Sequence, residues 1–218
     1  MILNKNLGIY FLGFLLFSAG CAPPARTVLS LGSSEDLRGC LTIFPSGPWE
    51  SVHKIEAVFR GGVASTLLGV TKGEPSARRM QCLLLAPEGF TLFEGEFREG
   101  KIKVKKAVPP FDSPAFAEGL MEDVSLLFLP PPTGPTSWGT ASDGSRACIW
   151  EDPDGYQTEV RESPDQVRLI RRRDDHGEVI RKVSLEGPFV QGLAAYMELQ
   201  VLKPASYTLK MTLVQSGP

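Results

Sequence analysis

Histidine and cysteine, which supply most metal ligands and many catalytic side chains, are scarce in this sequence. The 218 residues contain 2 His and 4 Cys, and none of the common catalytic or phosphate-binding motifs is present. Cys40, Cys82 and Cys148 are widely spaced and have no histidine close by, which argues against a zinc site. We therefore expect no catalytic residues, no metal and no cofactor, and a protein that is not an enzyme.

A surplus of charge of one sign is also lacking. Lys and Arg together number 23 and Asp and Glu 25, so the formal net charge is −2. Without a basic surplus there is no electrostatic basis for binding nucleic acid, and we expect no such partner. The mean hydropathy of −0.04 excludes a polytopic membrane protein, and a content of 42% hydrophobic and 22% charged residues is typical of a globular domain.

A long apolar run occurs only near the N-terminus. Residues 7–17 are almost all apolar and follow Lys5, as in a secretory signal peptide. As a helix this run would span about 16 Å, roughly half of a bilayer core, so it is too short for a lasting membrane span. The segment 18–21, Ser-Ala-Gly-Cys, follows it and resembles the bacterial lipoprotein box.

The resemblance to the lipoprotein box implies that Cys21 carries lipid. In that family the peptide is cut before the cysteine, the thiol is diacylated, and the acyl chains hold the protein on a bilayer. Ala22 after the cysteine resembles the outer-membrane-sorted class of a Gram-negative host. We therefore expect a signal peptide over 1–20 and a lipidated tether with an entry loop over 21–49, on a protein that faces the periplasm from the outer membrane. The alternative is an ordinary signal peptide, in which Cys21 has no such role.

The other three cysteines bear on the redox environment. In an oxidising periplasm one pair among Cys40, Cys82 and Cys148 can form a disulfide, and all three pairings remain open. Cys82 lies in an apolar, strand-like run over 80–85. This position favours a buried thiol that packs like a small apolar side chain.

Glycine and proline are plentiful, at 22 and 18 residues, and they divide the chain into short segments. Over 52–107, and again over 147–214, apolar and polar residues alternate between turns that recur about every 8–12 residues. Such spacing is typical of an antiparallel meander. Ser113-Pro114 resembles a helix start, and apolar residues at helical spacing predict one helix over 114–128.

We expect a mainly β domain over 50–218, with one or few helices. About ten strands would form a strongly curved antiparallel sheet, an unclosed half-barrel, whose concave face is covered by the helix and a Pro-rich loop. A concave face that the helix does not fill is an apolar pocket suited to lipid. The alternative is a filled core. The residues expected to line the pocket and bind the ligand are Phe90, Leu92, Phe93, Phe116, Leu120 and Leu127.

Three stretches resemble the lipoprotein-localisation (LolA/LolB-like) half-barrel superfamily. The first is an apolar strand, a Pro-x-Gly turn and a second apolar strand over 83–93. The second is the order of residues 104–111 followed by the helix through 123–130, and the third is the hairpin of 167–171 with 179–183. The resemblance implies a half-barrel that binds the acyl chains of lipoproteins or related amphiphiles.

These patterns together predict a membrane-anchored lipoprotein that binds or transfers a lipid, an acylated protein or another long apolar ligand. The alternative is an assembly or scaffold lipoprotein that has a filled core and acts through protein contacts. In the family that the chain resembles, the receptor-type member has an apolar loop that helps to insert cargo into the membrane. The corresponding turns here, at 61–64 and 71–74, expose no aromatic residue or leucine, which argues against that role. Arg171–Arg173 can bind a phosphate head group, and the lysines of 101–106 can contact an anionic lipid. The alternative for both stretches is that they are solvated strand residues with paired charges.

Overall fold

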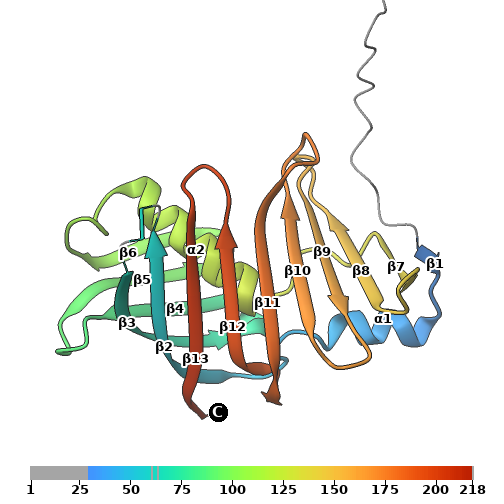
Figure 1. Ribbon diagram of the computed structural model, residues 1–218, viewed down its shortest axis with the longest axis horizontal. Helices are drawn as coiled ribbons and strands as arrows, with labels where there is room; N and C mark the ends of the chain where they lie inside the picture. Colours follow the sequence, from blue (N-terminus) through green and yellow to red (C-terminus); the bar gives the residue numbers. More distant parts are fainter. Residues whose placement is uncertain (1–28, 60, 63, 218) are drawn as a thin grey trace, which may run out of the picture.

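The computed structural model describes residues 29–59, 61–62 and 64–217. The expected signal peptide, Cys21 and the first part of the expected tether lie outside these residues. Within them, thirteen strands form one antiparallel sheet in the order β1-β7-β8-β9-β10-β11-β12-β13-β2-β3-β4-β5-β6 (Figure 1). The strands are β1 (Leu29–Leu31), β2 (Trp49–Phe59), β3 (Ala64–Glu74), β4 (Arg79–Leu85), β5 (Thr91–Arg98), β6 (Lys101–Ala107), β7 (Ser137–Ala141), β8 (Arg146–Glu151), β9 (Gln157–Glu162), β10 (Arg168–Arg173), β11 (Val179–Val190), β12 (Leu193–Val201) and β13 (Tyr207–Gly217).

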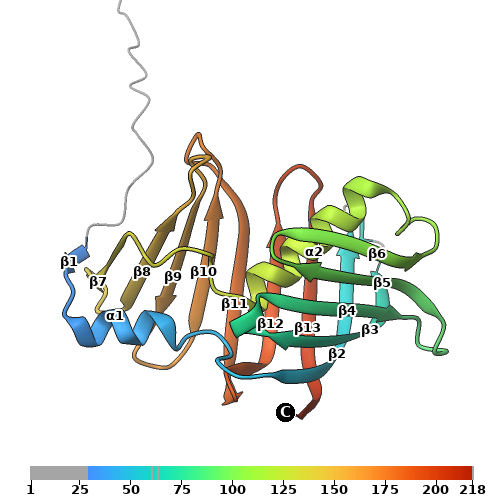
Figure 2. The same ribbon diagram turned by 180° about the vertical axis from the view of Figure 1, so that it is seen from behind.

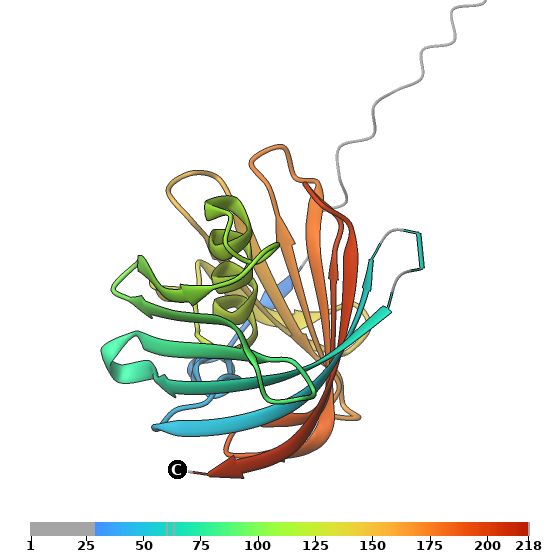
Figure 3. The ribbon, with the colours of Figure 1, turned by 90° about the vertical axis from the view of Figure 1, so that its left-hand side faces the viewer.

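Helix α2 (Pro114–Phe128) lies against the concave face of the sheet (Figure 3). The hydroxyl of Ser113 caps it by accepting a hydrogen bond from the Phe116 N–H at 3.2 Å. Pro114 stands at the first helical position, where a backbone N–H would have no partner within the helix. The predicted helix over 114–128 is therefore confirmed. Its buried residues are Ala117, Leu120, Met121, Asp123, Val124, Leu127 and Phe128.

The sheet curves around α2 without closing (Figure 3). In the described part of the chain its outer strands, β1 and β6, each pair on one side only. At the β5–β6 turn, Glu99 and Gly100 both have a positive φ, 50° and 80°. Two such residues form the tight turn whose twist matches that of the paired strands. The expected mainly β half-barrel, with a helix on its concave face, is thus confirmed.

The region expected to be a tether contains ordered structure. Beyond β1 it holds helix α1 (Ser34–Leu41), which lies beside β7 and β8 (Figure 2). Ser33 and Asp36 form a capping box: the Ser33 hydroxyl accepts from the Asp36 N–H, and the Asp36 carboxylate accepts from the Ser33 N–H. A disulfide between Cys40 and Cys148 then joins α1 to β8. This settles the pairing that the sequence left open, and Cys82 is the free, buried thiol among the described cysteines.

Two further details differ from expectation. The turn placed at 71–74 belongs to β3, and the chain reverses instead at a short 3₁₀ helix, Pro75–Ala77. The sheet also exceeds the expected ten strands, in part because β1 and β7 have only 3 and 5 residues. Strands this short show too few alternations to stand out in a sequence. Neither α1 nor α2, the α-helices among the described residues, is long and apolar enough to cross a bilayer.

Candidate ligand-binding cavity

A cavity of about 300 Å³ lies between α2 and the inward faces of β2, β3, β4 and β13. Apolar side chains make up most of its wall, among them Ile55, Leu67, Leu120, Leu127 and Met211. They face one another because alternate residues of a strand share a face and residues of a helix three or four apart share another. The volume is at the lower end of the range for small-molecule sites.

The residues that line the cavity extend along β2 from His53 to Phe59 and along α2 from Ala115 to Phe128. One end, the rim, includes Phe59 and Phe111, and the Phe59 side chain is 42% exposed. The opposite, deep end includes His53 and Phe128, whose ring centroids are 5.8 Å apart. From His53 to Phe59 the strand advances about 20 Å, because each strand residue adds about 3.3 Å.

Three of the six predicted pocket residues line the cavity, and all three lie on α2: Phe116, Leu120 and Leu127. The other three, which precede or belong to β5, do not line it. Phe93 is fully buried, and its ring covers Gly95 beside the sulfur of Met121.

Phe90 and Leu92 also lie away from the cavity. The Phe90 side chain is 71% exposed because it follows the turn at Gly89, whose φ is 88°. Leu92 packs partly buried against the core. Helical periodicity thus identified three residues of α2 that line the cavity. The alternation along β5 could not show whether an inward-facing residue packs in the core or lines the cavity.

The sequence reasoning missed the contribution of β2 and β3. Ile55 and Ala57 follow the period-2 alternation, which predicts that their side chains point inward. The alternation could not predict that they line a cavity. Two glycines of the wall differ in their surroundings. Gly119 lies on α2, where an added Cβ would meet no atom within 4 Å, whereas at Gly69 on β3 the Ile55 side chain already fills that space, 2.7 Å from an added Cβ.

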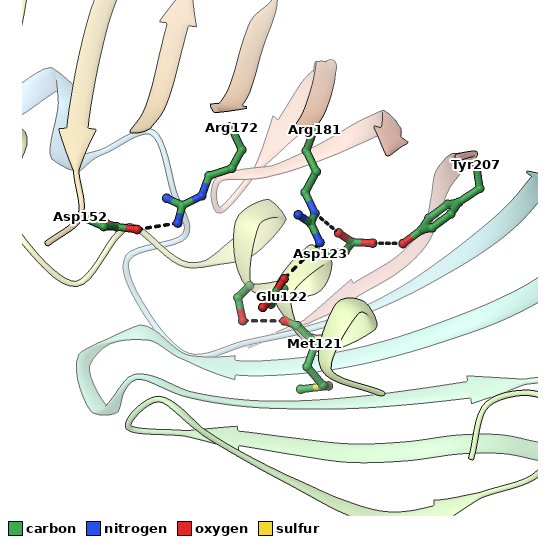
Figure 4. A network of polar contacts seen from close by, with 8 residues as sticks. Met121, Glu122, Asp123, Asp152, Arg172, Arg181 and Tyr207 are labelled. Atoms are coloured by element: carbon green, nitrogen blue, oxygen red, sulfur yellow. Dashed lines mark hydrogen bonds and ion pairs between the residues drawn. The ribbon is translucent and has the colours of Figure 1, made fainter. Parts of the chain in front are cut away.

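A buried polar network closes one side of the cavity (Figure 4). Arg181 Nε donates to Asp123 Oδ1 at 2.5 Å, and its Nη2 donates to Glu122 Oε2 at 3.1 Å. The Tyr207 hydroxyl donates to the second Asp123 carboxylate oxygen. The network joins α2 to β11 and β13, and it pairs Asp123 with both Arg181 and Tyr207 beside an otherwise apolar space.

Burial dominates the titration of this network. It raises the pKa of the Asp123 carboxyl, and the neighbouring Arg181 guanidinium opposes that rise. Burial also raises the pKa of the Tyr207 phenol, with the Asp123 charge adding to the effect. At neutral pH the phenol is therefore a hydrogen-bond donor to the carboxylate, which suits a structural tie between helix and sheet.

A second hollow of about 680 Å³ lies along the other face of α2, toward β8–β11. Charged and polar groups contribute much of its wall, and several of them are already paired. Arg172 Nη2 donates to Asp152 Oδ2 at 2.5 Å (Figure 4), and the Arg172 guanidinium lies 5.1 Å from the centre of the Tyr156 ring. Arg181 borders both hollows. The smaller, apolar cavity is the better site for an acyl chain.

The two basic stretches noted in the sequence lie on strands. In β10, Arg172 pairs with Asp152 and Arg173 Nη1 donates to the Gly177 carbonyl at 3.0 Å. In β6, Lys105 pairs with Glu94 at 3.3 Å on an outer strand of the sheet. These contacts fit the interpretation that both basic stretches are solvated strand residues with paired charges. Lysines on an outer strand also discourage that strand from pairing with another chain.

Comparison with known proteins gives structural matches only. No protein-family model and no curated protein matches the sequence. The chain is similar to a LolA superfamily protein from Nitrosomonas europaea, at 7% identity and a TM-score of 0.48, over 86% of this chain and 93% of that one. An outer membrane lipoprotein-sorting protein domain from Vibrio parahaemolyticus matches at 8% identity and a TM-score of 0.48, over 84% and 90%. A DUF1329 family protein from Desulfovibrio piger matches at 11% identity and a TM-score of 0.45, over 84% and 90%.

Proposed function

We propose that this protein is a lipid-anchored, non-enzymatic binding or transfer protein that holds a long apolar ligand between α2 and the sheet. The ligand is a lipid, an acylated protein or a similar amphiphile. The observation that carries the proposal is the apolar cavity of about 300 Å³. Burial of an acyl chain against this apolar wall is favourable by about 0.8 kcal/mol for each CH₂ group removed from water.

The scaffold alternative has less support. It requires an interior filled by side chains, whereas a cavity lies between α2 and the sheet, and an added Cβ at Gly119 on its wall would meet no atom within 4 Å. A glycine inside a helix is unfavourable by about 1 kcal/mol relative to alanine. Its presence at position 119, facing the cavity, is consistent with selection for space over helix stability.

Binding of an apolar fluorescent probe such as Nile red tests the proposal. We expect the wild-type protein to bind the probe and 1-dodecanol to displace it. Gly119→Leu should weaken binding severalfold by placing a side chain in the cavity. The matched control is Glu118→Leu, which adds the same side chain to the neighbouring, exposed position. Absence of probe binding by the wild type, or equal binding by Gly119→Leu, would count against the cavity as the site.

We further propose that Cys21 carries the lipid anchor and that the folded domain faces the periplasm from the outer membrane of a Gram-negative host. Cys21 precedes the described residues, so the support is the lipoprotein-box pattern at 18–21. Cells grown with radiolabelled palmitate should label the wild type and Cys82→Ser but not Cys21→Ser. Unlabelled wild-type protein would refute the anchor while leaving the cavity proposal intact.

A further inference from the structure

The inward face of β2 carries three buried polar atoms that have no hydrogen-bond partner within the described residues. They are Trp49 Nε1, Ser51 Oγ and His53 Nε2, which alternate along the strand and so share one face. A buried polar atom without a partner lowers stability, and native proteins usually provide one. Of the three residues, His53 lines the cavity.

His53 stands at the deep end of the cavity and is only 2% exposed. The residue opposite on β3 is Gly69, and the Ile55 side chain packs over that glycine. Thr71, which is also buried, is the neighbouring polar residue on the cavity wall. Burial lowers the pKa of His53 to about 4. The ring is therefore neutral at pH 7, and a neutral imidazole nitrogen can accept or donate one hydrogen bond.

The surroundings of His53 favour an uncharged partner. Asp123 and Arg181 are the charged side chains on the cavity wall, and they are paired with each other. An ionised head group would lose its hydration there without gaining a free counter-charge, which is strongly unfavourable. The desolvation cost of a hydroxyl or an unionised carboxyl is much smaller, and either group can donate a hydrogen bond to the ring nitrogen.

We propose that the cavity takes a single-chain amphiphile with its polar end first, and that an O–H group at that end donates a hydrogen bond to His53 Nε2. The alkyl tail then extends toward the rim at Phe59 and Phe111. Fatty alcohols and protonated fatty acids share this chemistry. The inference rests on the proposed function and deepens it, because it assigns the polar end of the ligand to the closed end of the cavity.

Competition against bound Nile red can test this orientation with pairs of ligands that differ in one O–H group. The pairs are 1-dodecanol with dodecyl methyl ether, and dodecanoic acid with methyl dodecanoate. We expect the wild type to prefer the O–H member of at least one pair by about three- to tenfold, the usual value of one hydrogen bond. The pair that shows the preference identifies the alcohol or the acid as the source.

Variants show whether His53 is responsible for the preference. His53→Phe keeps an aromatic ring but removes the nitrogen, so the preference should disappear. His176→Phe, the same change at an exposed histidine, should retain it. Should His53→Phe not fold, ¹⁵N NMR of wild-type histidine supplies a second test, because 1-dodecanol should shift the Nε2 resonance of the buried ring and the ether should not.

The outcomes separate this inference from the proposed function. If the wild type binds both members of each pair equally, or if the preference survives in His53→Phe, the polar-end-first orientation is wrong and the cavity is still a binding site. If the wild type binds none of the four ligands and does not bind Nile red, the proposed function itself fails.

Discussion

At the scale of single residues, the Asp123–Arg181 pair is the feature on which the helix–sheet packing most depends. The side chains of Asp123 and Arg181 are 1% and 10% exposed, and they are joined by a charge-assisted hydrogen bond. Removing one member of such a pair leaves the other charge buried without its partner, which typically destabilises a protein by about 3–5 kcal/mol. Arg181 retains a contact with Glu122, so the lower end of that range applies.

We therefore predict that Asp123→Ala lowers the free energy of unfolding by about 3 kcal/mol, measured by urea denaturation. Glu122→Ala is the matched control, because its side chain is 64% exposed and contacts the same arginine. That control should cost less than about 1 kcal/mol. Equal losses in the two variants would show that the buried carboxylate has no special role.

The buried imidazole of His53 should make the free energy of unfolding depend on pH. The folded protein keeps the imidazole neutral down to a pKa of about 4, whereas the unfolded chain is protonated near 6.5. Unfolding therefore takes up a proton between these values, so His53 makes the folded state less stable as the pH falls. Between pH 7 and 4.5 the expected loss is about 2 kcal/mol.

Urea denaturation at both pH values checks this, with the contribution of His53 taken as the difference between wild type and His53→Phe. His176→Phe should retain the loss that His53 causes, because the buried His53 ring is unchanged in that variant. A wild-type loss no larger than that of His53→Phe would mean that the histidine is not buried as described.

At the scale of elements, glycines distinguish the filled and the hollow parts of the interior. Gly119→Ala should raise the free energy of unfolding by up to about 1 kcal/mol, since alanine favours the helix and its methyl group meets nothing. Gly95→Ala should lower it, because the new Cβ would lie 2.7 Å from the buried ring of Phe93. Denaturation of both variants tests the contrast, and effects of the same sign would contradict it.

Helix α1 depends on its disulfide. It buries one residue, Cys40, so little apolar packing holds it against the sheet. The Cys40–Cys148 bond spans 108 residues, and cross-links of this span typically stabilise by roughly 2–5 kcal/mol. We predict that reductant lowers the unfolding midpoint of the wild type but not that of a Cys40→Ser, Cys148→Ser double variant. An unchanged wild-type midpoint would oppose this.

The two helices also show what a sequence can reveal about elements. For α2, a Ser-Pro start, apolar residues at helical spacing and a following run of prolines gave its residue bounds. For α1, apolar periodicity was nearly absent, and the informative signal was the capping pair of Ser33 and Asp36, which the sequence analysis did not use. The disulfide could not be chosen from three pairings, because spacing alone does not report which strands lie together.

At the scale of the whole molecule, one curved sheet carries two different hollows on either side of a single helix. The half-barrel itself was predictable, since many alternating segments joined by tight turns have few other ways to bury their apolar faces. Whether its interior is filled was not. Alternation predicts that Phe93 and Ile55 both point inward. The Phe93 ring is fully buried in the core, whereas the Ile55 side chain lines the cavity. That distinction depends on side chains from distant elements that meet in three dimensions.

Native mass spectrometry tests most directly the claim that the cavity holds an acyl chain. The full-length protein would be purified from cells without added lipid. We predict an adduct with the mass of an acyl-chain ligand on the wild type and on Glu118→Leu, lost on denaturation and absent from Gly119→Leu. A wild-type protein that carries no adduct and takes up none of the four dodecyl ligands would contradict the account.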